Sequence, residues 1–250
     1  MGILQNLSFL WGQELSKKNN DYTLDNVYIV IPLYNEESIL YEVITDLQKT
    51  FSNIIVVDDG STDNSNELLK DMDVTLITHS INLGQGAAIK TAFEYVCTID
   101  QAFAVVTFDA DGQHSTKDAI NFANEIIGCE EDIIFGTRFI ENEEYVPRLK
   151  RVVLKFATRV TNFLTNVKLT DTHNGLKAIK IKAIKKLNVD ISGYAFESQL
   201  IVEVGRAKLL YKEISTHISY TEYSMKKGQG IRNSLIIAED IINLMRLKWF

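Results

Sequence analysis

Residues 27–33 read VYIVIPL, a nearly continuous run of apolar residues that predicts a strand buried on both of its faces. Helical spacing follows over about 36–50, and residues 53–57 (NIIVV) predict a second strand. The alternation continues through strands expected at 74–78, 103–108 and 132–136 and helices expected at about 63–71, 85–98 and 116–128. Strands that alternate with helices indicate βαβ units, so we expect an α/β fold with a mostly parallel sheet flanked by helices.

The second half of the chain is less regular. It predicts helices at about 148–166, 195–207 and 230–247 and short strands near 176–180, 210–214 and 217–220. Nothing between residues 136 and 176 has the composition of a flexible linker, which favours one continuous domain over residues 27–222. We expect residues 1–26 to form an N-terminal amphipathic extension, and residues 223–250 to form a basic loop and a C-terminal amphipathic helix.

The composition narrows the class of protein. The 250 residues are 46% hydrophobic and 24% charged, which rules out a disordered chain. A net charge of −7, from 26 Lys and Arg against 33 Asp and Glu, argues against general nucleic acid binding. Cys97 and Cys129 are too few for a disulfide framework, and no apolar run reaches membrane-spanning length. The first residues lack the pattern of a secretory signal, so we expect a cytoplasmic protein.

The sharpest chemical motif is FDADGQH, at residues 108–114. Two carboxylates two residues apart, directly after a hydrophobic strand, cannot both enter an apolar core without a large desolvation cost. In an irregular turn, Asp109 and Asp111 can both reach one hard divalent cation, with Gln113 or His114 as a further ligand. Mg²⁺ or Mn²⁺ suits such a site, because these ions combine a few protein oxygens with substrate phosphates. The structural alternative is a solvated, Asp-rich turn that caps the next helix.

Two polar segments follow the first two predicted strands. In residues 31–37 (IPLYNEE), Tyr34 would pack on a base or ribose and Glu36 would accept from a ribose hydroxyl. In residues 56–65 (VVDDGSTDNS), Asp58 or Asp59 would accept the imide N–H of a nucleobase. The structural alternatives are a simple turn for the first segment and an N-cap by Ser61 or Thr62 for the second. Ligands in such sheets lie beyond the carboxyl ends of the strands, so we expect both segments and the Asp109 turn to converge.

A glycine-containing loop opens the helix expected at 85–98. In INLGQGAAIKTAF, residues 81–93, Gly84 and Gly86 permit a tight turn and a close approach of backbone to a ligand. The segment is neither a Walker loop nor a GxGxxG fingerprint. Its structural alternative is a loop that packs the helix.

Together these segments resemble the family 2 inverting glycosyltransferases of the GT-A fold, and most closely the branch of the polyprenyl-phosphate hexose synthases. The resemblance covers roughly residues 27–220. The matching motifs are Pro32-Leu33-Tyr34-Asn35-Glu36, Val57-Asp58-Asp59-Gly60-Ser61, Asn82-Leu83-Gly84 with Gly86, Asp109-Ala110-Asp111 with Gln113, Gly136-Thr137-Arg138, and Gly175-Leu176-Lys177 after Asp171. The fold class that this resemblance implies is a GT-A, Rossmann-like sheet.

The resemblance also implies a role for individual residues. The nucleotide sugar would be held by Pro32, Tyr34, Glu36, Val57, Asp59, Gly86, Asp109, Ala110 and Lys177. Asp109, Asp111 and Gln113 would bind the metal, and Arg138 and Arg151 would meet the acceptor phosphate. The catalytic residues would be Asp111, Arg138 and Glu197. Departure of a nucleoside diphosphate needs its growing negative charge stabilised, which a metal and these cations would do.

The reaction implied is a metal-dependent, inverting transfer of a hexose from a UDP- or GDP-sugar to a polyprenyl phosphate. An ionised phosphate acceptor needs no general base, whereas a glycan hydroxyl needs a carboxylate such as Glu197 to take its proton. Transfer to a glycan hydroxyl in cell-surface polysaccharide synthesis is therefore the first alternative. A protein that binds nucleotide sugars without catalysis and an Asp-based phosphatase are two others.

The two ends of the chain carry apolar stripes. The C-terminal stripe is flanked by basic residues and consists of Ile231, Leu235, Ala238, Ile242, Met245 and Trp249. It predicts a helix docked on the domain, an interfacial membrane helix or a face for a small membrane-protein partner. The N-terminal segment invites the same interpretations. A lid over the donor is expected from Ser224, Lys227, Gly228 and Gln229, and the location would be peripheral at the inner face of the cell membrane.

Overall fold

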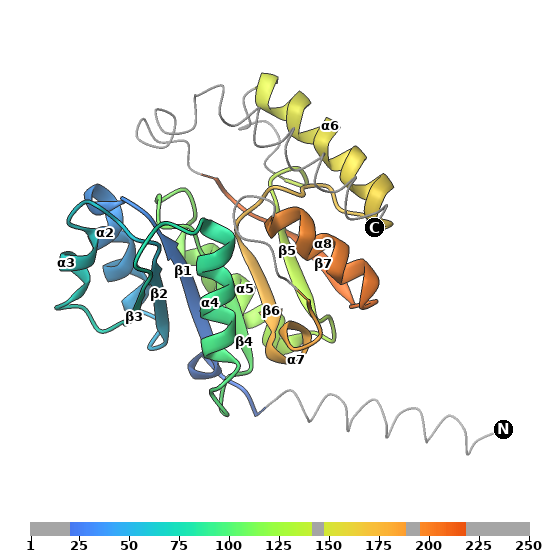
Figure 1. Cartoon of the computed structure of the whole chain (residues 1–250). Coiled ribbons are helices and arrows are strands. Elements are labelled where there is room, and N and C mark those ends of the chain that lie inside the picture. The colour runs from blue at the N-terminus through green and yellow to red at the C-terminus, as the bar shows by residue number, and fades with distance from the viewer. Residues whose placement is uncertain (1–20, 142–147, 189–195, 219–250) are drawn as a thin grey trace, which may run out of the picture.

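The computed structural model describes residues 21–141, 148–188 and 196–218 (Figure 1). The expected C-terminal stripe and lid, and nearly all of the N-terminal extension, lie outside these residues. The elements are η1 (Leu24–Asn26), β1 (Val27–Leu33), α2 (Glu37–Gln48), β2 (Ile54–Asp58), α3 (Ser65–Leu69), β3 (Thr75–Thr78), α4 (Gln85–Val96), β4 (Ala104–Thr107), α5 (Thr116–Gly128), β5 (Ile133–Thr137), α6 (Arg148–Thr165), β6 (Lys177–Lys180), α7 (Ile181–Ile184), α8 (Phe196–Arg206) and β7 (Tyr211–Ser215).

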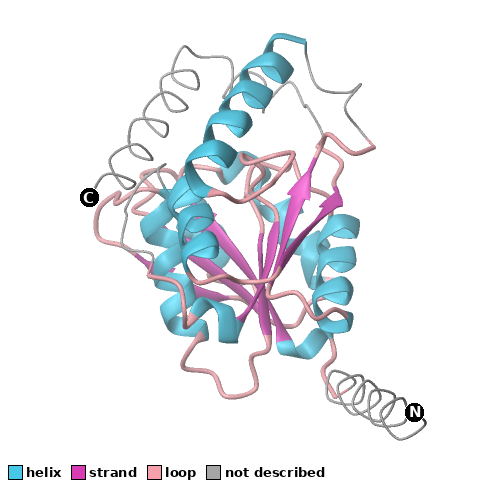
Figure 2. Cartoon of the chain, turned by 90° about the vertical axis from the view of Figure 1, so that its right-hand side faces the viewer, coloured by secondary structure: helices cyan, strands magenta, loops and turns pink. Residues whose placement is uncertain are grey.

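The strands form one seven-stranded sheet in the order β3-β2-β1-β4-β6-β5-β7. Only β6 runs antiparallel to its neighbours β4 and β5, and the other pairs are parallel. Helices cover both faces of the strands (Figure 2). The expected α/β fold with a mostly parallel, helix-flanked sheet is confirmed.

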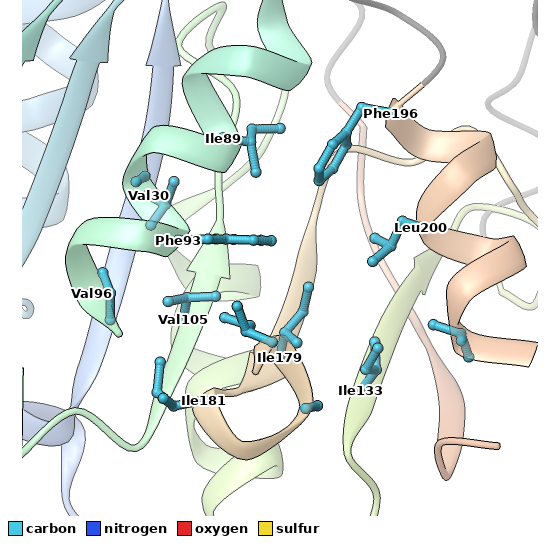
Figure 3. Packing of buried hydrophobic residues seen from close by; sticks show 14 of the residues in the cluster. Val30, Ile89, Phe93, Val96, Val105, Ile133, Ile179, Ile181, Phe196 and Leu200 are labelled. Atoms are coloured by element: carbon cyan, nitrogen blue, oxygen red, sulfur yellow. The ribbon is translucent and has the colours of Figure 1, made fainter. Parts of the chain in front are cut away.

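Successive apolar residues of each strand point to opposite faces of the sheet, and each face has its own hydrophobic core. Val30 and Val105 point to one face, where they meet Phe93 of α4 and Leu200 of α8 (Figure 3). The rings of Phe93 and Phe196 pack edge to face there, with centroids 6.2 Å apart. The neighbouring strand residues point to the other face and pack against α2, α3 and α5. The continuous apolar runs in the sequence therefore reflect strands buried on both sides.

Pro32 lies inside β1, a central strand, and the ladder explains why proline is tolerated there. The odd-numbered residues of β1 bond to β2, since Ile29 N–H donates to Asn53 and Leu33 accepts from Asp59. The even-numbered residues face β4, whose pairing with β1 stops at Val30 and Thr107. The missing N–H of Pro32 thus faces a position that β4 does not reach, and no ladder bond is lost. Beyond this point β1 and β4 separate, and the polar segments begin.

Some element boundaries differ from the sequence expectation. The helix expected at 63–71 is shorter, because α3 begins at Ser65 and its first N–H is accepted by Asp63. The structural alternative of an N-cap by Ser61 or Thr62 is therefore wrong. The short helix α7 was not expected, since it directly continues the apolar run of β6. The strand expected at 217–220 is absent at residues 217 and 218, and its remainder lies outside the described residues. None of the described helices has the length and apolarity to cross a bilayer.

Candidate functional site

The loops after β1 and β2 are tied together by hydrogen bonds. Asn35, in the left-handed region with φ of 55°, accepts the N–H of Thr62 on its side-chain oxygen at 2.8 Å. Its own N–H donates to the hydroxyl of Ser61 at 3.0 Å. The N–H of Glu36, a buried residue, donates to the hydroxyl of Ser65 at 3.1 Å. These bonds hold two of the predicted polar segments side by side at the carboxyl edge of the sheet.

Asp59 anchors the glycine-containing loop before α4. Its carboxylate accepts the N–H of Leu83 at 2.9 Å and the N–H of Gly84 at 2.7 Å, and it lies 2.7 Å from Nδ1 of His79. Gly84 caps α4 with φ of 96°, a backbone conformation that favours glycine. Asp58 instead accepts the N–H of Ser61 in its own turn and the side-chain amide of Asn66 in α3. Asp59 therefore has a structural role in addition to any contact with a ligand.

Asp109 lies at the centre of the site, in contact with three other segments. Its Oδ1 accepts from the amide of Gln85, the first residue of α4, at 3.1 Å, and its Oδ2 lies 3.2 Å from Nε2 of His114. A Cβ added to Gly175 would stand 2.7 Å from Cγ of Asp109 and closer still to Oδ2. Burial raises the pKa of Asp109, but His114, Lys177 and Arg138 outweigh it and leave the pKa below its usual range.

His114 contacts the carboxylate of Asp109 through its Nε2 atom. Its side chain is buried, and its ring lies 5.8 Å from that of Phe108. Nδ1 is buried without a hydrogen-bond partner in the described part of the chain. The Nε2 of His114 is the ring nitrogen that lies within hydrogen-bonding distance of Asp109, so its N–H is the one that donates to the carboxylate. His114 thus acts as a donor to Asp109.

Asp111 and Gln113 form the second half of the acidic turn. Asp111 accepts the backbone N–H of Gln113 at 3.0 Å and its side-chain amide at 2.6 Å. Burial, followed by the nearby charge of Asp109, raises the pKa of Asp111 to about 6. Two crowded carboxylates of this kind are stabilised by a cation between them. Since the O and N atoms of an amide exchange places by a simple flip, Gln113 can offer its oxygen as well.

This donor set fits a hard divalent cation. Asp109, Asp111 and Gln113 supply carboxylate and amide oxygens, the ligands that Mg²⁺ and Mn²⁺ prefer. The described residues contain no cluster of three or more His, Cys, Asp or Glu side chains that could hold a metal. The described chain therefore offers two carboxylates and one amide here, with coordination positions left for a ligand.

Lys177 brings a positive charge to the acidic turn from the start of β6. It is buried, and its Nζ donates to the backbone carbonyl of Asn174 at 2.6 Å. The same Nζ lies 2.6 Å from Oε2 of Glu197, at the start of α8. Burial raises the pKa of Glu197, although the charge of Lys177 partly opposes this. Lys177, which the sequence analysis assigned to the nucleotide sugar, and Glu197, which it assigned to catalysis, therefore form one ion pair.

Arg138 is clamped below the surface at the end of β5. Its Nε donates to the carboxylate of Asp171 at 2.6 Å, and its Nη2 donates to the backbone carbonyl of His173 at 2.5 Å. Glu213 of β7 in turn accepts the N–H of Thr170 at 2.8 Å and that of Asp171 at 3.2 Å. Arg138 is therefore held in a buried position by Asp171, and its positive charge acts on Asp109.

The structure brings most of the predicted site residues to one edge of the sheet. Tyr34 is 43% exposed there, whereas Pro32, Val57, Gly86 and Ala110 contribute backbone and packing beside it. Arg151 lies in the first turn of α6, partly buried. Sequence reasoning missed Gln85, which contacts Asp109, and it named Gly175 only as part of a motif, without its contact with Asp109. It also missed the roles of Asp171 and Glu213, which hold Arg138 in place. Asp171 appeared in the sequence analysis only as a position preceding a motif, since a long-range ion pair leaves no local pattern.

The chain matches a known family over most of its length. The family model described as Glycosyl transferase family 2 matches residues 28–187. An uncharacterised protein of Methanocaldococcus jannaschii is 31% identical over 227 residues, which cover 87% of this chain and 93% of the relative. A UDP-N-acetylglucosamine–dolichyl-phosphate N-acetylglucosaminyltransferase of Methanococcus voltae is 31% identical over 227 residues, 82% of this chain and 90% of that protein. A polyprenol monophosphomannose synthase of Mycolicibacterium smegmatis is 27% identical over 83% of each chain.

Solved structures share the fold at low identity. Glucosyl-3-phosphoglycerate synthase of Mycobacterium tuberculosis superposes with a TM-score of 0.69 at 15% identity, over 94% of this chain and 84% of that one. A crystal of the same enzyme with Mn²⁺, UDP and glucosyl-3-phosphoglycerate gives a TM-score of 0.65 at 16% identity, over 91% and 84%. The likeness supports the expected GT-A sheet.

Proposed function

Because the chain belongs to glycosyl transferase family 2 and is a glycosyltransferase, we propose that it moves a hexose from a nucleotide sugar to a polyprenyl phosphate. The observation that carries the proposal is the turn of Asp109 and Asp111 at the carboxyl edge of the sheet, where the positive charge of Lys177 acts on Asp109. Transfer from a nucleotide sugar needs a place for the diphosphate, where negative charge grows as the sugar leaves. Here a cation faces a pair of carboxylates that can hold a metal.

The metal site of the proposal is the acidic turn. Asp109, Asp111 and Gln113 would hold Mg²⁺ or Mn²⁺, which when bound neutralises the charge of the departing diphosphate. Gln85 and His114 both donate to Asp109 and so fix the direction of its oxygens. Preorganised ligands of this kind lose little entropy when the metal and donor bind.

The donor's nucleoside would lie over the loops after β1 and β2. Tyr34 exposes a ring on which a base or ribose can pack, and Glu36 lies beside it at the start of α2. Asp59 keeps the loop before α4 in place, so that Gly84 and Gly86 leave room for the ligand beside the helix. UDP and GDP sugars are both candidates, and the relative of Methanococcus voltae makes UDP-N-acetylglucosamine the first to test.

A polyprenyl phosphate is the favoured acceptor for two reasons. Two relatives that match more than four-fifths of the chain are named as a dolichyl-phosphate N-acetylglucosaminyltransferase and a polyprenol monophosphomannose synthase. A phosphate oxygen is already ionised and attacks without a general base. Glu197, the carboxylate first considered as a base, is engaged by Lys177 at 2.6 Å. In this reaction Glu197 would position Lys177, and Lys177 and Arg138 would supply positive charge to the phosphates.

The test is a transfer assay with a panel of donors. The full chain would be incubated with UDP- and GDP-sugars, a polyprenyl phosphate and Mn²⁺ or Mg²⁺, with product followed by mass. We expect a lipid-linked sugar phosphate, no product with a chelator present, and no product from Asp111→Ala with its circular dichroism unchanged. Asp71→Ala, at an exposed position on the β2–β3 connection, is the matched control and should keep full activity. Chelator-resistant turnover would refute the metal assignment.

A glycan hydroxyl is the second candidate acceptor, favoured by one observation. Burial raises the pKa of Glu197, which suits a carboxylate that must take a proton. The two acceptors leave different products, since a sugar phosphodiester is released by mild acid and carries the mass of the lipid. A sugar transferred only to an oligosaccharide would replace the proposed function with this second one.

A further inference from the structure

Helix α6 (Arg148–Thr165) presents an apolar stripe to solvent. Val152 is 67% exposed, Phe156 is 62% exposed, and Phe163 is 77% exposed. Positions 152, 156, 159 and 163 follow one another at steps of four, three and four, so they lie along one face of the helix. Large apolar side chains gathered on one exposed face of a helix mark an interaction surface. We call Val152, Phe156, Arg159 and Phe163 the outer face of α6.

The opposite face of α6 packs on residues 169–173, the segment that holds Arg138. Leu154, Ala157 and Thr161 are buried, and the hydroxyls of Thr158 and Thr172 lie 3.2 Å apart. Asn162 closes the same contact, because its amide donates to the carbonyl of Leu169 at 2.7 Å. The segment 169–173 is the one whose Asp171 and His173 hold Arg138. Figure 1 shows α6 above α8, and the burial of Leu154, Ala157 and Thr161 puts the outer face on the opposite side of the helix.

The charge of α6 is opposite to that of the chain. The helix contains five basic residues and no Asp or Glu, namely Arg148, Lys150, Arg151, Lys155 and Arg159. The chain as a whole carries a net charge of −7. Arg159 lies on the outer face itself and is exposed, and Lys155 lies one turn before it. A helix with an apolar face and basic flanks is suited to lie in the plane of an anionic lipid surface.

We propose that the outer face of α6 docks the enzyme on an anionic lipid bilayer. The proposal rests on the proposed function in one respect, since a polyprenyl acceptor has its phosphate at such a surface. Val152 and Phe156 enter the region of the headgroups, while Arg159 pairs with lipid phosphates. In that orientation α6 lies between the membrane and the segment 169–173, and Arg138, which this segment holds, is on the membrane side of the domain. The sequence had placed membrane contact at the two ends of the chain, and α6 provides a surface within the folded domain.

The charge favours a bilayer over a second copy of the chain. Two copies that met through this face would bring the exposed Arg159 of one helix against the same basic helix of the other copy, which like-charge repulsion opposes. An anionic bilayer supplies the opposite charge over the whole length of the helix. Binding should therefore weaken with salt and with loss of anionic lipid.

The experiment is flotation of the full chain with vesicles. Wild type should float with vesicles of phosphatidylcholine containing about one-third phosphatidylglycerol, and much less with phosphatidylcholine alone. V152S/F156S should reduce the bound fraction at least about tenfold, because two apolar side chains no longer leave water. Arg159→Gln should reduce binding about fivefold on the anionic vesicles only. Tyr41→Ser is the matched control, since Tyr41 is an aromatic residue 59% exposed on α2, and it should bind like wild type.

The transfer assay separates this proposal from the proposed function. With a short, water-soluble polyprenyl phosphate, V152S/F156S should keep wild-type turnover, and only transfer to acceptor in vesicles should fall. Failure of wild type to use any polyprenyl phosphate would refute the proposed function, while the flotation results would still decide the docking surface. Unchanged flotation of V152S/F156S would overturn the docking proposal. So would a wild-type dimer in solution that the same variant abolishes.

Discussion

The Nζ of Lys177 lies 2.6 Å from Oε2 of Glu197, so the cation that faces the acidic turn is held by a carboxylate from a later helix. Both side chains are withdrawn from solvent, with exposed fractions of 3% for Lys177 and 21% for Glu197. The carbonyl of Asn174 fixes the ammonium group from the other side. The pair therefore keeps a charge in position for the donor's phosphates before the donor arrives.

Lys177→Met should abolish most turnover without unfolding the protein. Methionine keeps the length of the side chain and removes the charge that stabilises the leaving diphosphate, which is worth about 10²- to 10³-fold in kcat. Steady-state kinetics with saturating Mn²⁺ and donor would measure the loss, and near-ultraviolet circular dichroism would monitor the fold. A variant that is well folded and turns over within threefold of wild type would contradict the role of Lys177.

Glu197→Gln distinguishes a positioning carboxylate from a general base. Glutamine still accepts a hydrogen bond from Lys177, so with a polyprenyl phosphate acceptor we expect less than about a tenfold fall in kcat. The acidic limb of the pH–rate profile should stay where it is in wild type. A loss of several hundredfold, together with disappearance of that limb, would assign Glu197 as the base and favour a hydroxyl acceptor.

Gly175→Ala should damage the site while leaving the sheet intact. The new Cβ would stand 2.7 Å from Cγ of Asp109, so either the carboxylate or the segment before β6 must move. A shift of about an ångström in a metal ligand costs on the order of 10²-fold in rate. The apparent affinity for Mn²⁺, measured by titration of activity, should weaken as well.

Gly128→Ala is the control for that substitution. A Cβ at Gly128, the last residue of α5, would meet nothing within 4 Å. Alanine there should leave activity unchanged and leave the free energy of unfolding equal or higher by up to about 1 kcal/mol. Full activity of Gly175→Ala with wild-type metal affinity would show that the packing of Gly175 on Asp109 has no functional role.

Asp171→Ala should be strongly destabilising, because it leaves the buried charge of Arg138 without its partner. Asp171 is completely buried, and removal of one member of a buried ion pair costs about 3–5 kcal/mol. Urea unfolding followed by circular dichroism would measure the change. Glu67→Ala removes one partner of an exposed pair with Lys70 and should cost less than about 1 kcal/mol. Equal effects of the two substitutions would contradict the clamp on Arg138.

The sequence predicts the first half of this fold well because each element has a local signature. The runs at 27–33 and 53–57 end within a residue of β1 and β2, since their buried strands are apolar throughout. The acidic turn was also visible, because Asp109 and Asp111 follow a strand directly. Convergence of the turns could be inferred as well, from the rule that parallel strands present their carboxyl ends at one edge.

The contacts that complete the site could not be predicted in the same way. The ion pair of Arg138 with Asp171 spans 33 residues, and the contact of Gly175 with Asp109 spans a longer stretch. Such pairs depend on the antiparallel strand β6, which enters the sheet between β4 and β5, two strands that follow one another in the chain. The exposed face of α6 was missed for a related reason. Amphipathic spacing shows that a helix has two faces, but which apolar residues remain in water depends on what packs against it.

The raised pKa of Asp111, about 6, predicts that protons compete with the metal. Ionisation of Asp111 is opposed in the metal-free fold by burial and by Asp109, so below pH 6 the carboxyl holds a proton that a metal must displace. From pH 7 to pH 5 the affinity for Mn²⁺ should fall about tenfold through this group, which isothermal titration calorimetry would measure together with the released proton.

The raised pKa of Asp111 affects folding stability in the opposite direction, since lower pH favours the metal-free fold. A carboxyl whose pKa is higher in the folded state than in the unfolded state destabilises the fold above pH 6, and the penalty fades as pH falls from 6 towards 4. Asp111→Asn should therefore raise the melting temperature of the metal-free protein at pH 7.5 and remove its stabilisation by Mn²⁺. An Mn²⁺ affinity that stays constant between pH 7 and pH 5 would show that Asp111 is not a ligand.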